Sequence, residues 1–205
     1  LGSLEPRTIT EDFCRRAAAL PNLCPHFHLS LQSGCDATLA RMNRKYDSSR
    51  YYKSIQLLRE YFSDPGITTD LITGFPGETE EEFVQTLSFI QSCAFTAMHI
   101  FPYSRRHGTP ADTMPGQVSK EEKEARARRA IALASEMERR WLGQQVGRTL
   151  PVLFEEEKGG LWQGHTPSYA LVRAQGKALH NRLADVKITG VDKDALMGTV
   201  LETGG

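Results

Sequence analysis

The stretch from Ile67 to Phe83 constrains the fold most, because ITTDLITGFPGETEEEF predicts a strand, a tight loop and a helix in succession. Ile67 to Thr73 is rich in β-branched residues, which is typical of a buried strand. Gly74, Pro76 and Gly77 then favour a turn whose backbone can approach a ligand closely. We expect this turn at the carboxyl end of a parallel strand, where α/β proteins bind their ligands. An ordinary βα turn is the simpler alternative on glycine spacing alone.

The helix that follows the turn carries its own start signal. Thr79 and Glu82 fit a capping box, in which hydroxyl and carboxylate close the first helical turn. Phe83, Leu87 and Ile90 recur at helical spacing and predict one buried face.

Residues 26–32 alternate strictly between apolar and polar side chains. The apolar set is Phe27, Leu29 and Leu31, and the polar set is His28, Ser30 and Gln32. Alternation of this kind predicts a strand with the two sets on opposite faces. We expect the apolar set to pack against helices and the polar set to face a barrel interior, where polar groups near strand ends indicate a site.

The remaining N-terminal elements extend the same pattern. We expect a strand end at residues 1–6, helices from Thr10 to about Leu20 and from Tyr51 to Phe62, a short helix capped by Asp36, a strand at 97–101 and a loop at 104–111. Three β-α repeats followed by a strand predict an α/β fold with a parallel sheet, open or closed as part of a barrel.

A long charged helix is expected from Ser119 to Trp141. Seven Lys and Arg residues outnumber five Glu in it. A solvated linker helix and a surface that follows nucleic-acid phosphates are both compatible with this composition.

From Gly147 the chain changes to short β-rich runs separated by glycines. They predict a small antiparallel barrel of the size at which five strands can close. Exposed polar and aromatic side chains of small barrels often bind RNA. The candidates here are His165, Tyr169, Arg173 and Asn181. Basic and acidic residues balance at seven each from Arg148 onward, so an inert accessory barrel is equally compatible.

Composition excludes some function classes. Lys and Arg total 25, as do Asp and Glu, so no bulk electrostatic attraction to nucleic acid or membrane is expected. No stretch approaches a membrane span or a signal peptide. The four cysteines are too scattered for a metal site, and we expect free, buried thiols in a reducing cytoplasm: Cys14, Cys24, Cys35 and Cys93.

Three long segments, in order, resemble the methylthiotransferases, radical S-adenosylmethionine enzymes that insert sulfur into tRNA or a ribosomal protein. They are HLSLQSGCDATLARMNRKY (28–46), TDLITGFPGETEEEF (69–83) and FPYSRRHGTPA (101–111). GRTLPVLFEE (147–156) and WQGHTPSYALV (162–172) resemble the TRAM domain that ends these proteins. The run 101–111 looks most like the branch acting on threonylcarbamoyl-adenosine at position 37 of tRNA. The isopentenyl-adenosine and ribosomal-protein branches are the alternatives.

This resemblance implies the second half of a radical barrel at residues 1–118, a linker helix at 119–146 and a TRAM RNA-binding barrel at 147–205. It also implies tRNA and an electron-donor protein as partners. The family's CxxxCxxC motif, whose thiolates hold a 4Fe–4S cluster, is not in this sequence. We therefore expect a piece of a longer protein, with no catalytic or metal-binding residue of its own and inactive alone.

The resemblance further implies an S-adenosyl-L-methionine site. Polar side chains for the ribose would be Ser3, Glu5 and Gln32. The carboxylate would meet Arg44 or the turn at Ser33-Gly34. The adenine would lie against the backbone of Gly74, Pro76 and Gly77 and the wall formed by Phe101 and Tyr103. Glu5 as a turn cap and Arg44 as a surface arginine are the simpler alternatives.

A different class of function remains open at this point. The chain would then be a stand-alone RNA-binding or scaffold protein that borrows half of a barrel. Cysteines in CxxxCxxC spacing upstream in the reading frame would favour the enzyme.

Overall fold

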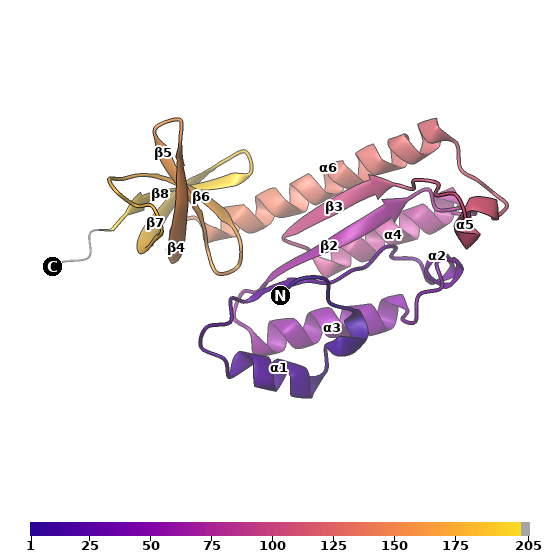
Figure 1. The fold of residues 1–205 in the computed structure, drawn as a ribbon, viewed down its shortest axis with the longest axis horizontal. Coiled ribbons are helices and arrows are strands. Elements are labelled where there is room, and N and C mark those ends of the chain that lie inside the picture. The colour runs from indigo at the N-terminus through magenta and orange to yellow at the C-terminus, as the bar shows by residue number, and fades with distance from the viewer. Residues whose placement is uncertain (202–205) are drawn as a thin grey trace. The chain divides into compact units, whose positions relative to one another are not determined.

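The computed structural model describes residues 1–201, and the chain divides into two units. Unit 1 comprises Leu1–Leu23 and Phe27–Met137, and unit 2 comprises Cys24–His26 and the chain from Glu138. The helices are η1 (Pro6–Thr8), α1 (Glu11–Ala18), α2 (Asp36–Arg41), α3 (Ser48–Tyr61), α4 (Glu80–Cys93), α5 (Pro110–Thr113) and α6 (Lys120–Gln145) (Figure 1). The strands are β1 (His26–His28), β2 (Gly66–Thr73), β3 (Ala97–Pro102), β4 (Thr149–Lys158), β5 (Leu161–His165), β6 (Leu171–Gln175), β7 (Arg182–Asp192) and β8 (Ala195–Val200).

The sheet of unit 1 has the order β1-β2-β3, and β2 and β3 are parallel as predicted. Parallel bridges join Leu4 to Leu29 and Gln32 to Leu71. Pairing therefore continues beyond the short strand β1, and residue 4 adds to the edge of the sheet. All the carboxyl ends of these strands meet at one edge, which is where a ligand site is expected.

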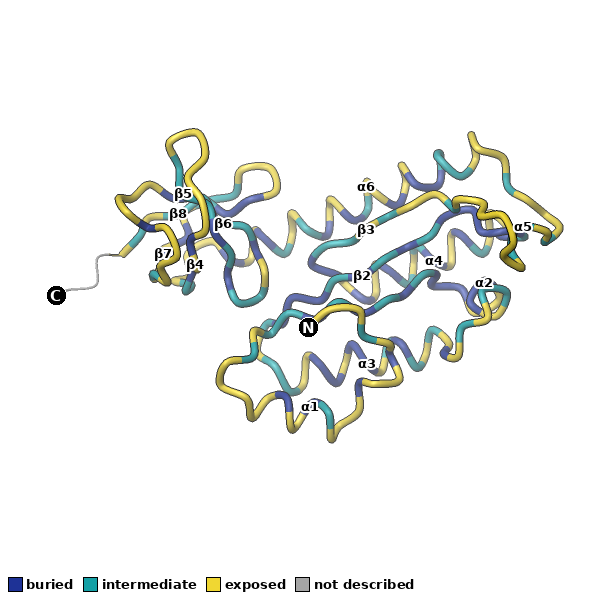
Figure 2. Tube along the Cα trace, in the orientation of Figure 1, coloured by how far each residue is buried: buried dark blue, intermediate teal, exposed yellow. Residues whose placement is uncertain are grey.

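The predicted alternation along residues 26–32 is confirmed. Phe27, Leu29 and Leu31 have no exposed surface and belong to the core with α3 and α4 (Figure 2). The polar residues between them are only partly buried. Since successive side chains of a strand point to opposite faces, one face of the sheet is covered by helices and the other presents polar groups.

Helix starts follow the sequence signals in two of three cases. Thr79 and Glu82 form the predicted capping box of α4, with both hydrogen bonds present. Thr10 caps α1 by accepting a hydrogen bond from the Phe13 amide at 3.1 Å. Both caps use hydrogen bonds between residues three apart in the sequence, so they can be predicted without knowledge of the tertiary packing.

The prediction that Asp36 caps a short helix is wrong. Cys35 holds the N-cap position of α2 and makes no side-chain cap bond. The Asp36 carboxylate instead accepts a hydrogen bond from the Ser48 amide at 2.7 Å, at the start of α3. Asp47 caps α3, so this helix begins three residues before the predicted Tyr51.

Unit 2 contains a closed barrel with strand order β4-β5-β6-β8-β7. The prediction of a wholly antiparallel barrel is wrong for one pair, because β6 and β8 are parallel. A ring of five strands cannot alternate direction at every step, so closure requires one parallel pair. Strand β5 was not predicted from the sequence. Within it, a Cβ on Gly164 would lie 2.1 Å from the Leu153 carbonyl oxygen of β4. Only glycine permits that approach.

Candidate functional site

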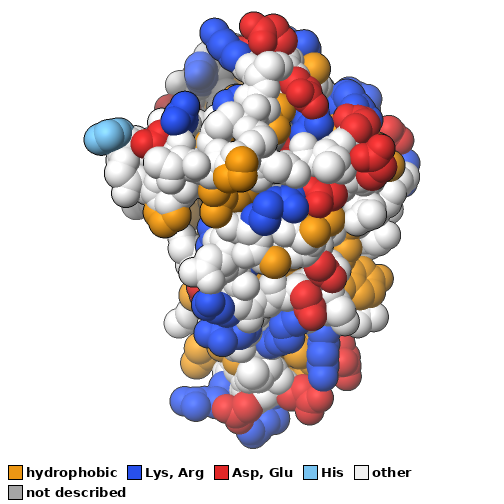
Figure 3. Space-filling model, turned by 90° about the vertical axis from the view of Figure 1, so that its right-hand side faces the viewer, with side chains coloured by type: hydrophobic (Ala, Val, Ile, Leu, Met, Phe, Trp, Pro, Cys, Tyr) orange, Lys and Arg blue, Asp and Glu red, His pale blue; other side chains and the backbone are white. Residues whose placement is uncertain are grey.

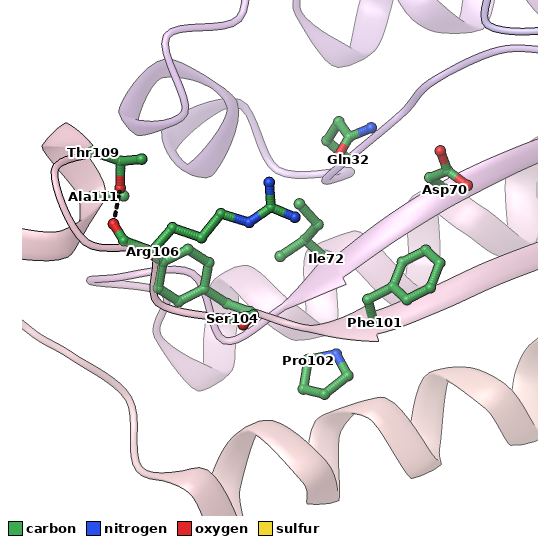
Figure 4. Close-up of a pocket in the computed structure, with 10 residues that line it drawn as sticks. Gln32, Asp70, Ile72, Phe101, Pro102, Ser104, Arg106, Thr109 and Ala111 are labelled. Atoms are coloured by element: carbon green, nitrogen blue, oxygen red, sulfur yellow. Dashed lines mark hydrogen bonds between the residues drawn. The ribbon is translucent and has the colours of Figure 1, made fainter.

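A cavity of about 600 Å³ lies at the carboxyl ends of β2 and β3 in unit 1 (Figure 4). Its walls are mainly apolar, with a few polar side chains, as is typical of small-molecule sites. The lining residues are Gln32, Asp70, Ile72, Phe101, Pro102, Tyr103, Ser104, Arg106, Thr109 and Ala111. Three residues predicted to bind a cofactor, Gln32, Phe101 and Tyr103, are thus brought to one cavity.

Asp70 provides a carboxylate at one side of the cavity and was not identified from the sequence. Its Oδ2 lies 3.2 Å from His28 Nε2, and His28 Nδ1 lies 3.0 Å from Thr68 Oγ1. All three belong to the polar face of the sheet. The alternation of Thr68, Asp70 and Ile72 along the strand is the signal that could have placed Asp70 beside His28.

Gln32 is held in a left-handed backbone conformation, with φ of 68°. Its amide donates to the Asp70 carbonyl at 2.9 Å, and its carbonyl accepts from the Ile72 amide at 3.0 Å. Such a conformation is unfavourable for a residue with a side chain and persists where surrounding bonds impose it. The strain therefore lies at the cavity wall.

The turn from Gly74 to Gly77 follows the carboxyl end of β2 as predicted. It is not among the residues that line this cavity, so its expected contact with the adenine stays a prediction. A Cβ on Gly74 would lie 2.1 Å from Lys123 Cγ. Gly77 has φ of +78°, and its amide donates to the Gly116 carbonyl at 2.8 Å. Neighbouring protein groups, rather than this cavity, account for both glycines.

A buried ion pair holds this turn against α6. Glu78 and Arg126 have side chains only 1% and 3% exposed, with Oε2 and Nη1 2.9 Å apart. Glu78 Oε2 also accepts from the Gly74 amide at 2.6 Å. Burial raises the pKa of Glu78, while the Gly74 amide and Arg126 act to lower it.

The other predicted cofactor residues lie outside the cavity lining, and their roles stay predictions. Ser33 is fully buried and within hydrogen-bond distance of Thr86 Oγ1, at 3.2 Å. Ser3 and Glu5 are exposed, and Pro76 is buried.

Two buried polar atoms suit an adenosyl cofactor. Within residues 1–201, Tyr103 Oη and Arg44 Nε have no hydrogen-bond partner. Buried polar atoms are normally paired, and Tyr103 also borders the cavity, so a polar ligand would satisfy at least this hydroxyl. The unpaired Tyr103 hydroxyl and the polar groups of Gln32 and Asp70 are thus chemically compatible with the ribose and adenine of S-adenosylmethionine.

The described residues do not fit an iron–sulfur cluster. In residues 1–201 no group of three or more His, Cys, Asp or Glu could hold a metal ion. All four cysteines are free; Cys14, Cys35 and Cys93 are buried as expected, whereas Cys24 is exposed. Burial raises the pKa of the Cys93 thiol to about 12, which disfavours the thiolate that a cluster needs.

In unit 2, two of the predicted RNA-binding residues stack on one another. The rings of His165 and Tyr169 are 4.5 Å apart, and His26 stacks on Tyr169 at 4.7 Å. His165 Nδ1 lies 2.6 Å from Glu155 Oε2. Tyr169 thus has an aromatic ring stacked on it from each of two histidines, which leaves its edge and hydroxyl for other contacts.

The other two candidates are separate from this stack. Arg173 Nη2 lies 3.4 Å from Asp194 Oδ1, so a carboxylate already partly neutralises it. Asn181 precedes β7 with φ of 58°, and its amide donates to the Phe154 carbonyl at 2.8 Å. A turn role accounts for this asparagine.

The basic residues of α6 are less available to phosphates than the sequence suggested. At least five of the seven interact with other protein groups, Arg140 among them. The other four pairs are Lys120 with Glu124, Lys123 with the Tyr103 carbonyl, Arg126 with Glu78, and Arg129 with Glu80. Buried Ala127 and Ala130 show that the first half of the helix is packed, so a solvated linker is also a wrong description of it. Over the part of the chain that the structure describes, no helix is both long enough and apolar enough to span a membrane.

Comparison with known proteins agrees with this fold. Residues 3–90 match the family model of the radical SAM superfamily. The structure of coproporphyrinogen III oxidase (HemN) from Escherichia coli, described as a radical SAM enzyme, aligns with a TM-score of 0.54 and 21% identity. The alignment covers 71% of this chain and 33% of the HemN chain. At 21% identity the likeness shows a shared fold.

Curated relatives match over nearly the whole chain. A tRNA-2-methylthio-N(6)-dimethylallyladenosine synthase from Streptomyces avermitilis is 40% identical over 97% of this chain and 38% of its own length. One of the same name from Nitratidesulfovibrio vulgaris is 36% identical over 94% of this chain and 45% of its own length. The chain thus spans less than half of these relatives. The chain is thus similar to part of these tRNA-modifying relatives, and residues 3–90 are similar to the radical SAM superfamily.

Proposed function

We propose that this chain is part of a tRNA methylthiotransferase, which adds a methylthio group to C2 of an N6-modified adenosine. The observation that carries the proposal is the similarity to relatives of that activity along 97% of the chain, through both units. S-adenosyl-L-methionine would be the cofactor, and it supplies radical chemistry when bound beside a reduced 4Fe–4S cluster. The cluster ligands would lie in other parts of the protein, and an electron-donor protein would reduce it in the cytoplasm.

In this proposal the cavity of unit 1 positions an adenosine group. Ile72, Phe101 and Tyr103 would provide the apolar surface against which the adenine ring lies. Gln32 and Asp70 offer hydrogen bonds to ribose or amino groups. The barrel of unit 2, which the resemblance identifies as a TRAM domain, would contact tRNA.

Two N6 substituents are candidates. Both curated relatives are named for dimethylallyladenosine, an apolar substituent, which supports the isopentenyl-adenosine substrate. The second candidate is threonylcarbamoyl-adenosine at position 37, which the sequence of residues 101–111 favours. Arg106 in that run places a cation at the cavity. A guanidinium can pair with the carboxylate of a threonylcarbamoyl group but forms no such bond with a hydrocarbon substituent.

The test is modification of tRNA by the intact protein from the complete reading frame, with reconstituted clusters. Transcripts carrying either N6 group would be digested, and their nucleosides separated and weighed by mass spectrometry. We expect a methylthio adduct on one of the two nucleosides. Loss of the adduct on omission of S-adenosylmethionine is the control. Intact clusters with neither nucleoside modified would refute the proposal and favour a non-catalytic RNA-binding module or a ribosomal-protein target.

A further inference from the structure

Arg106 is the single cationic side chain among the residues that line the cavity. It comes from the loop between β3 and α5. Its guanidinium makes no hydrogen bond or ion pair with any residue in the described range 1–201. Arg106 is exposed, so its guanidinium is free to meet a negative charge on a ligand in the cavity.

The neighbouring charges of the loop are already paired, which sets Arg106 apart. Arg105 Nε lies 2.5 Å from Asp112 Oδ1, and His107 Nδ1 lies 3.5 Å from Asp112 Oδ2. Asp112 therefore faces two other cationic groups of the same loop. The loop presents two adjacent arginines, and only Arg106 lines the cavity.

The backbone at Arg106 is held while its side chain is left to bind. Its carbonyl accepts hydrogen bonds from Thr109 N at 3.2 Å and from Thr109 Oγ1 at 2.8 Å. Figure 4 shows the side chain extending into the cavity, with the guanidinium toward Gln32 and Ile72. A fixed backbone reduces the ordering cost of using a long side chain in recognition.

The carboxylate that lines the same cavity is engaged elsewhere. Asp70 Oδ2 lies 3.2 Å from His28 Nε2, so the polar face of the sheet holds Asp70 in place. Between Asp70 and Arg106 the wall is apolar, formed by Ile72 and Phe101. Charge-assisted hydrogen bonds between a guanidinium and a carboxylate are stronger than neutral ones, so an anionic ligand group would favour Arg106 over the other lining residues.

We propose that Arg106 recognises a carboxylate on the ligand of this cavity and thereby determines specificity. The inference rests on the proposed function and names a chemical group that function requires. Two sources can supply it: the α-carboxylate of S-adenosylmethionine, or a carboxylate on the N6 substituent of adenosine, as in threonylcarbamoyl-adenosine. A dimethylallyl group would leave the guanidinium unpaired, and sites built for a polar partner reject analogues that lack it.

The experiment is ligand titration of the 205-residue chain, followed by NMR, with two matched pairs of probes. One pair is S-adenosylmethionine and its decarboxylated analogue. The other pair is N6-threonylcarbamoyladenosine, which carries a carboxylate, and N6-dimethylallyladenosine, which does not. The variants are Arg106→Gln and Arg106→Lys, with Arg105→Gln as control, because Arg105 does not line the cavity. Equal unfolding midpoints establish that each variant folds.

We expect Arg106→Gln to weaken binding of one carboxylate-bearing probe by about 10- to 100-fold, and Arg106→Lys to weaken it less. Binding of its carboxylate-free partner and the behaviour of Arg105→Gln should stay within twofold of wild type. Which pair responds identifies the source of the carboxylate. Equal losses within a pair, no loss in either pair, or no wild-type binding of either carboxylate probe would overturn the proposal. None of these outcomes bears on tRNA modification by the intact protein, so the proposed function stands or falls separately.

Discussion

At the level of single residues, the buried side chain of Arg126 is important for the stability of the fold. Its guanidinium, 3% exposed, pairs with Glu78 and Glu122 and contacts the ring of Phe83. Replacing it by glutamine leaves the Glu78 carboxylate buried without its countercharge. We expect Arg126→Gln to lower the free energy of unfolding by about 3–5 kcal/mol at pH 7, measured by urea denaturation.

The same variant should show a defined pH dependence. Burial raises the pKa of Glu78 above its ordinary 4.5, so its contribution to stability is fully present below the unfolded-state pKa and is lost as pH rises through the folded one. Without Arg126 the folded pKa rises further, so the deficit of the variant should shrink as pH falls from 7 toward about 5. Arg129→Gln, at an exposed ion pair with Glu80, should cost at most about 1 kcal/mol at either pH. A deficit independent of pH would contradict this account.

The structure gives a different explanation for glycine at position 77 than the sequence did. From the sequence, Gly77→Val should weaken S-adenosylmethionine binding by blocking backbone approach. With φ of +78° and a Cβ position 3.3 Å from Arg41 Nε, valine is strained whatever the ligand.

We therefore expect Gly77→Val to destabilise the fold by about 1–3 kcal/mol, which chemical denaturation would measure. Gly143→Ala is the matched control, because the space around Gly143 in α6 is open. It should gain about 0.5–1 kcal/mol. Unchanged stability of Gly77→Val together with lost ligand affinity would restore the original explanation.

At the scale of elements, α4 depends on its capping box. The Thr79 hydroxyl oxygen accepts a hydrogen bond from the Glu82 amide at 3.2 Å, and Glu82 Oε2 accepts one from the Thr79 amide at 3.2 Å. The Glu82 carboxylate also pairs with Arg41, which lowers its pKa. We expect Thr79→Ala to lower the free energy of unfolding by about 0.5–2 kcal/mol, whereas Thr79→Ser should keep most of it. Equal losses in the two variants, by urea denaturation, would mean that the methyl group rather than the hydroxyl matters.

At the scale of the whole molecule, charge is mixed rather than concentrated. The chain has 25 basic and 25 acidic residues, and the face in Figure 3 intersperses the two kinds. At least five of the seven basic side chains of α6 are already engaged, so the proposed tRNA binding would rest on a few placed groups. Each phosphate contact adds a slope of about −0.9 to log affinity against log salt on duplex nucleic acid, so few contacts give a shallow slope.

We expect weak tRNA binding by the chain that survives moderate salt. His165→Ala with Arg173→Ala should reduce it while leaving S-adenosylmethionine binding intact, because these residues and the cavity belong to different units. Arg182→Ala, an exposed arginine of β7, controls for the loss of charge. Filter binding at several salt concentrations would measure this, with heparin as the competing polyanion. Equal affinity for tRNA and heparin would leave the barrel as an accessory domain.

Much of the candidate site was visible in local patterns. The faces of residues 26–32 and the capping box at Thr79 were correct, because strand and helix periodicity depend on near neighbours. Gln32, Phe101 and Tyr103, which the resemblance assigned to one cofactor, do line one cavity, and their binding of that cofactor stays a prediction.

The order of strand, turn and helix, the buried faces and the caps of α1 and α4 follow from local sequence, since each depends on side chains a few residues apart. Which groups face the cavity and which stabilise the fold depends on contacts between distant segments. Gly74 meets Lys123 across 49 residues, and Glu78 meets Arg126 across 48, so their partners depend on how α6 packs. Of two adjacent arginines, Asp112 engages Arg105 and leaves Arg106 to the cavity. Long-range pairing of this kind is set by sheet register and helix packing, which local patterns do not encode.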